Sequence, residues 1–196
     1  MITNETYEKV QSRILEKLGF GLAKNLYYHG LHHTKDVLVH AERIAKEENS
    51  ISDEDLKLLK IACLYHDSGF LFTYKGHEEA GCKLVKVELP VFGFTEKQIE
   101  TICGCIMATR IPQTPKNELE EIICDADLDY LGRADFFPIS NTLFLEMKER
   151  DWVTDERDWN MKQVAFFNTH HYFTSTSKKW REPEKQKHLE QIEKMI

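Results

Sequence analysis

The chain has 196 residues, of which 41% are hydrophobic and 30% are charged, and its formal net charge is −7. This length and composition are typical of one globular domain over residues 1–196 that is large enough to bury a core. The negative charge argues against a nucleic-acid partner, because phosphate backbones are bound by clustered Lys and Arg. No apolar run approaches the roughly 20 residues of a membrane span, so no membrane association is expected.

The cysteine pattern and the N-terminal sequence predict a cytoplasmic protein. Five cysteines, an odd number without disulfide-framework spacing, stand at positions 63, 82, 103, 105 and 124. Most lie in apolar helical patterns, where a thiol acts as a small hydrophobic group, so we expect reduced thiols. The segment Cys103-Gly104-Cys105 does not match a usual zinc or redox motif, since its spacing is unusual and no second pair follows. The first residues lack the basic and apolar regions of a signal peptide.

Apolar residues recur at intervals of three and four along almost the whole chain, which is the period of an amphipathic helix. No segment shows the sustained alternation of a strand. The sequence therefore predicts an all-α, single-domain helical bundle, with a surface loop near 108–116 that holds two prolines. The predicted helical segments are 7–18, 37–49, 52–66, 76–89, 95–106, 117–130, 136–150, 155–171 and 183–195.

Several residues mark the predicted helix ends. Ser52 and Asn117 are suited to N-terminal caps, because their side-chain oxygens can accept a hydrogen bond from a free backbone N–H group. Thr95 and Gln98 have the spacing of a capping box. Pro183 would suit the first turn of the last helix, where its missing N–H group costs no hydrogen bond.

Four titratable residues stand in or at the end of segments that otherwise look like buried core, namely His33, His66, Asp67 and Asp127. Core positions rarely take such side chains unless a partner satisfies them. His66 and Asp67 follow an apolar run and come just before a helix-ending glycine, Gly69. Two imidazoles and two carboxylates form a mixed nitrogen and oxygen set that suits a divalent cation.

Asp127 belongs to an acidic string over residues 125–129 in which acids alternate with apolar residues. On helical spacing it shares a face with Ile123 and Tyr130, and this face is predicted to point inward. Asp125 and Asp129 lie off that face and are predicted to be solvated. An unpaired carboxylate on a core face would be costly, whereas one bound to a cation is satisfied.

These segments resemble the HD phosphohydrolase superfamily from about residue 25 to residue 135. The pattern Tyr-His-x-x-x-His-x-x-x-Val matches at 28–37, the His-Asp doublet at 66–67, and the trailing aspartate within the string 125–129. The resemblance implies an all-α bundle, in agreement with the helical pattern. It also implies a set of metal ligands, which would be His33, His66, Asp67 and Asp127.

The resemblance further implies catalytic roles for two residues. His29 occupies the position at which cyclic-nucleotide phosphodiesterases of this superfamily place the acid that protonates the leaving group. A histidine suits that role because its usual pKa of about 6.5 lets it carry a proton near neutrality. The alternative for His29 is a surface histidine or one that only supports the ligands. Asp67 would orient the nucleophile in addition to binding the metal.

One metal ion is expected, although His77 matches a third histidine of superfamily members that hold two. Those members supply a further histidine near the end of the next helix, and the region 105–110 has none. Lys75, His77 and Arg110 are instead expected to contact the substrate. Arg110 has the alternative of an exposed cation at a helix end. The aromatic string 166–173 is interpreted as core packing, with a base-stacking pocket as the alternative.

The function implied is hydrolysis of a phosphate ester, in a small nucleotide or related phosphorylated metabolite, by attack of a metal-bound water. The metal would be a single Mn²⁺, Fe²⁺, Mg²⁺, Zn²⁺ or Ni²⁺ ion. The main alternative is a catalytically silent module that binds a nucleotide or a protein partner. A di-iron oxygenase is disfavoured by the histidine missing from 105–110. The oligomeric state stays open, with a homodimer through an apolar helix face as one arrangement.

Overall fold

The computed structural model describes all 196 residues and contains helices and connecting turns but no strand. This confirms the predicted all-α fold. None of the helices is both long and apolar enough to cross a lipid bilayer. In chain order the helices are α1 (Asn4–Gly21), α2 (Leu31–Glu48), α3 (Asp53–Tyr65), η1 (Ser68–Leu71), α4 (His77–Glu88), η2 (Leu89–Phe92), α5 (Glu96–Ala108), α6 (Glu118–Asp127), η3 (Asp129–Gly132), α7 (Phe136–Lys148), α8 (Glu156–Thr169) and α9 (Ser175–Glu193).

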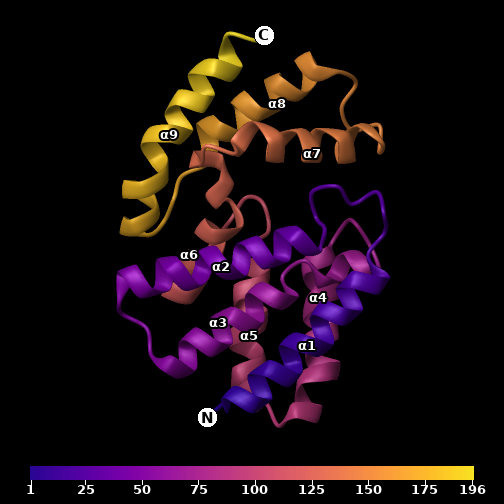
Figure 1. Cartoon of the computed structure of the whole chain (residues 1–196), viewed down its shortest axis with the longest axis vertical. Helices are drawn as coiled ribbons and strands as arrows, with labels where there is room; N and C mark the ends of the chain where they lie inside the picture. Colours follow the sequence, from indigo (N-terminus) through magenta and orange to yellow (C-terminus); the bar gives the residue numbers. More distant parts are fainter.

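The helices form two packed groups, which we call the N-terminal bundle (α1–α6) and the C-terminal layer (α7–α9) (Figure 1). The larger hydrophobic cluster lies inside the bundle and is centred on α3, whose residues 61–65 have almost no exposed surface. A smaller cluster joins α7, α8 and α9 to η3 and to Tyr28. The C-terminal layer therefore packs on the end of α6 and on the turn that precedes α2.

Local capping signals place the helix starts where the sequence predicts them. Ser52 accepts a hydrogen bond from the backbone N–H of Asp55, and Asn117 accepts one from Glu120. The reciprocal capping box of Thr95 with the third residue of α5 is also present. These interactions span three residues of one segment, so they form without help from the rest of the fold.

The last helix departs from the prediction at its start. It begins at Ser175, so Pro183 lies inside the helix and not in its first turn. The cap is Thr174, whose hydroxyl accepts the backbone N–H of Ser177 at 3.1 Å and donates to the Asp125 carboxylate at 2.7 Å. A contact with a residue far back in the chain therefore sets this boundary, and the pyrrolidine ring is accommodated within the helix.

The predicted exposure of Asp125 and Asp129 is wrong, because both carboxylates are buried. Asp125 accepts the backbone N–H groups of Phe173 and Thr174, both at 2.8 Å. These hydrogen bonds lower the pKa of Asp125, but the effect of burial is larger and raises it to about 6. Asp129 lies 2.7 Å from the guanidinium of Arg181. Residues 173, 174 and 181 therefore cover Asp125 on α6 and Asp129 on η3, which helical spacing assigns to solvent.

All five cysteines are free and buried, as their apolar surroundings predict. Cys103 and Cys105 point to different neighbours and form no joint site. Cys103 packs against Cys82 of α4, where each sulfur lies 3.6–3.8 Å from the other residue's carbonyl oxygen. The only group of three or more metal-ligating side chains in the chain is the one described next.

Candidate metal centre

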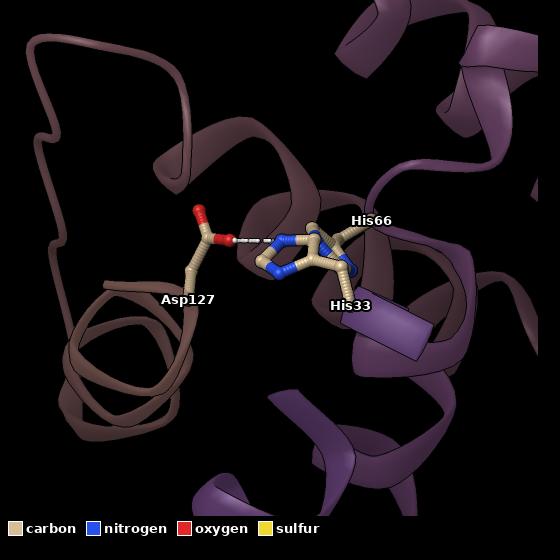
Figure 2. Close-up of side chains that lie close together, drawn as sticks. All are labelled: His33, His66 and Asp127. Carbon is tan, nitrogen blue, oxygen red and sulfur yellow. Dashed lines mark hydrogen bonds and ion pairs between the residues drawn. The ribbon is translucent and has the colours of Figure 1, made fainter. Parts of the chain in front are cut away.

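Three helix ends of the N-terminal bundle bring the predicted ligands together. Figure 2 shows three of them, His33, His66 and Asp127. His33 lies in the first turn of α2, directly after the turn at Gly30. His66 is the C-terminal cap of α3, and Asp67 follows it as the chain turns into η1. Asp127 is the last residue of α6. Chain ends of buried helices can hold polar groups because their backbone already leaves the regular spiral.

The donor atoms of these residues point at one another. His33 Nε2 lies 2.9 Å from Asp127 Oδ1 and 3.4 Å from His66 Nε2. Asp67 Oδ2 lies 3.2 Å from His66 Nε2 and 3.5 Å from His33 Nε2. One atom from each of His33, His66 and Asp127 lies within 4.8 Å of the other two. The distances describe a compact cluster of two nitrogens and two oxygens.

The donors fit a divalent cation. Asp67 Oδ2 is buried and has no hydrogen-bond partner within the chain. His66 donates from Nδ1 to the Cys63 carbonyl at 2.8 Å, so its Nε2 is the nitrogen available to a ligand. Burial opposes ionisation of Asp127, but the adjacent imidazoles of His33 and His66 lower its pKa to about 2. Ionised carboxylates and neutral imidazoles are the forms that bind metal.

A cavity of about 760 Å³ opens beside this cluster and is lined by residues of both the N-terminal bundle and the C-terminal layer. The two carboxylates, Asp67 and Asp127, are part of its wall, whereas His33 and His66 do not line it. The opposite wall comes from η3 and the C-terminal layer and is mainly apolar. It includes Leu131, Leu143, Met147, Trp159, Phe166 and Phe167. Phe167 of the aromatic string packs in the smaller core cluster, as expected, and it also lines the cavity.

His29 also lines the cavity, and its ring is held by a residue that the sequence did not single out. Glu146 of α7 accepts a hydrogen bond from His29 Nδ1 at 2.5 Å. It also accepts the Tyr74 hydroxyl at 2.7 Å and the backbone N–H of Tyr28 at 2.8 Å. No motif marks Glu146, because its only signal is an acid among apolar residues in a helix 117 positions away from His29.

The three residues expected to contact substrate all line the cavity, but they differ in the contacts they make within the chain. His77 Nε2 lies 3.5 Å from Asp67 Oδ1, so this ring is next to the cluster of candidate ligands. The guanidinium of Arg110 is paired with Glu79 and lies 3.4 Å from Glu78. Lys75 makes no ion pair, and its ammonium lies over the Trp152 ring, 5.9 Å from the centroid.

The sequence profile of the HD domain family matches residues 30–129, just over half of the chain. This match covers His33, His66, Asp67 and Asp127, the residues that form the cluster. The chain therefore belongs to the HD domain family, whose members are metal-dependent phosphohydrolases. His29 and Glu146 lie outside the matched segment.

Solved structures share the fold over almost the whole chain. A Lactobacillus plantarum protein has a TM-score of 0.67 at 19% identity, with 100% of this chain and 98% of that chain covered. A predicted HD superfamily hydrolase from an uncultured Thermotogales bacterium has a TM-score of 0.63 at 20% identity, with 96% of this chain and 90% of that chain covered. Bacillus subtilis YpgQ, solved in complex with ADP, has a TM-score of 0.65 at 19% identity, with 97% of each chain covered. No curated protein matches the chain.

Proposed function

We propose that this protein is a metal-dependent hydrolase of phosphate esters in a small nucleotide or related phosphorylated metabolite. One observation carries the proposal. Asp67 lines a large cavity, and its buried Oδ2 has no hydrogen-bond partner although it lies close to the imidazole nitrogens of His33 and His66. Membership of the HD domain family supports the reaction class. His33, His66, Asp67 and Asp127 would hold one divalent cation.

A bound divalent cation lowers the pKa of a coordinated water and offsets negative charge on a phosphoryl group. The chain supplies the other parts of the reaction. Asp67 has a second carboxylate oxygen, Oδ1, that faces His77 and can orient a water near the centre. His29 donates from Nδ1 to Glu146, and its Nε2 makes no hydrogen bond within the chain. That nitrogen is free to deliver a proton to the oxygen of the leaving group.

The cavity supports a substrate with a phosphate at one end and a flat or apolar group at the other. Its volume of about 760 Å³ lies in the range of small-molecule sites. Lys75 is a cation without an acidic partner and is suited to a phosphate oxygen. The apolar wall formed with the C-terminal layer suits a nucleobase. The structural similarity to YpgQ, which was solved with ADP, supports a nucleotide.

The first test is the metal content of protein purified without added metal or chelator, compared with the Asp67→Ala variant. About one divalent metal per chain, lost in the variant, is the expected result. The loaded protein is then assayed on a phosphomonoester and a phosphodiester. Absence of metal after reloading with Mn²⁺ contradicts the proposal. Bound metal without turnover on any ester favours a catalytically silent module that binds a nucleotide or a protein.

A further inference from the structure

The environment of Glu146 is built entirely from hydrogen-bond donors. Oε2 accepts the backbone N–H groups of Tyr28 and His29 at 2.8 and 3.1 Å, and Oε1 accepts His29 Nδ1 and the Tyr74 hydroxyl at 2.5 and 2.7 Å. The Glu146 side chain has 0% exposed surface. A group that accepts four hydrogen bonds and offers none must be a carboxylate, since an amide would turn an N–H group toward these donors.

These contacts fix both the position and the protonation pattern of the His29 ring. Its Nδ1 must carry the hydrogen that Glu146 accepts, which leaves Nε2 as the nitrogen on the cavity side. The ring also lies between two aromatic side chains, with Phe70 at 4.4 Å and Tyr28 at 4.7 Å between ring centroids. A ring held in this way cannot flip without breaking a buried, charge-assisted hydrogen bond.

We propose that Glu146 is the positioning residue for His29, holding Nδ1–H so that Nε2 donates the proton to the leaving group. This inference rests on the proposed hydrolysis. In that reaction water adds its oxygen to phosphorus and loses a proton to solvent. The bond from phosphorus to the leaving oxygen breaks, and that oxygen takes the proton from His29 Nε2. The carboxylate aligns the acid and does not touch the substrate.

The C-terminal layer thereby contributes a side chain to the site. Glu146 lies on α7, beyond the segment 30–129 that matches the family, while His29 stands just before α2. Burial opposes ionisation, but the hydrogen bond from His29 and the donors around it hold the pKa of Glu146 at about 2, so the carboxylate is charged at neutral pH.

The test compares leaving groups in the full-length, metal-loaded protein. Glu146→Gln keeps the shape of the side chain and removes the charge. It should lower kcat about 10- to 100-fold on an alkyl or nucleoside ester, whose leaving oxygen needs a proton. On the matched p-nitrophenyl ester, whose leaving group departs as an anion, the change should stay under about threefold. Glu149→Gln, at the exposed end of the same helix, is the control and should change neither rate.

A double-mutant cycle separates positioning from a general loss of structure. In a His29→Gln background, Glu146→Gln should cost less than about twofold further, because the acid it serves is already absent. Equal losses on both leaving groups, or losses that multiply in the double variant, overturn the proposal.

A readout without turnover keeps this inference distinct from the proposed function. Imidazole ¹⁵N NMR of the metal-loaded protein should show His29 protonated at Nδ1, and Glu146→Gln should mix the two tautomers. An unchanged His29 signal in the variant overturns the positioning role. If no ester is hydrolysed by any form, the proposed function fails, and the NMR result still decides whether Glu146 sets the tautomer.

Discussion

Gly69 and His77 are in such close approach that a Cβ at Gly69 would lie 1.8 Å from the His77 carbonyl oxygen. Gly69 stands two residues after Asp67 in η1, and His77 is the first residue of α4. The missing side chain therefore lets the start of α4 pack on the turn that holds the His-Asp pair. The sequence suggested only a helix-ending role for this glycine, but the structure shows a packing role at the centre itself.

Replacing Gly69 with Ala should lower the free energy of unfolding by about 1–3 kcal/mol, because the backbone of α4 must move away. Metal affinity should fall with it, since Asp67 moves with the turn. Urea denaturation and metal titration measure both effects. Gly19→Ala, in α1, is the matched control, because its Cβ would meet only Cδ2 of Leu31 in α2, at an ordinary contact distance of 3.7 Å. It should raise stability by about 0.5–1 kcal/mol, and equal destabilisation of both variants contradicts the packing role.

A bound metal should stabilise the folded protein, and this gain should depend on His33 but not on the adjacent His32. Any ligand that binds only the folded state adds about 2.7 kcal/mol at 100 times its Kd. Thermal unfolding with and without Mn²⁺ should show this gain in the natural protein and its loss in His33→Gln. His32→Gln is the control, because that ring is exposed on the same turn of α2 and lies outside the cluster. Loss of the gain in both variants would mean that metal binds elsewhere.

The apolar wall of the cavity should determine the affinity for the large part of the substrate. Leu143 of α7 lines the cavity, whereas Leu145 of the same helix has 43% of its surface exposed and does not. Leu143→Asn should raise KM for a nucleotide about 10-fold, as expected when an apolar contact worth about 1–3 kcal/mol is lost. The rate on methyl phosphate should change by less than about twofold. Leu145→Asn should change neither, and a matching effect from it would place the base elsewhere.

His170 should make the protein less stable as the pH falls below about 6. Burial and the nearby Lys185 ammonium lower the pKa of His170 to about 3. The unfolded chain, with a pKa near 6.5, therefore takes up a proton between pH 6.5 and 3 that the folded chain does not. Stability that is complete above pH 6.5 is lost through this interval at up to about 1.4 kcal/mol per pH unit.

The His170→Gln variant should show a shallower loss of stability over this pH interval, measured by urea denaturation at a series of pH values. His171→Gln is the control, since that residue is exposed. Identical slopes in His170→Gln and the natural protein would show that His170 becomes protonated in the folded state near its usual pKa.

The sequence alone determined the features that depend on neighbours along the chain. The capping box at Thr95, the caps at Ser52 and Asn117, and the all-α fold follow from interactions within three or four residues. The grouping of His33, His66 and Asp127 was also expected, because the resemblance to HD proteins implied it and because His66 and Asp127 interrupt apolar helical runs.

Only the tertiary structure decided how the C-terminal layer meets the bundle. Glu146 accepts a hydrogen bond from His29, which is 117 positions away in the sequence. Asp125 accepts one from Thr174, which is 49 positions away. Helical periodicity describes one face of one helix, and it carries no information about which distant helix covers the other face. For that reason the burial of Asp125 and Asp129, the early start of α9 and the partner of His29 emerged only when both groups of helices were packed together.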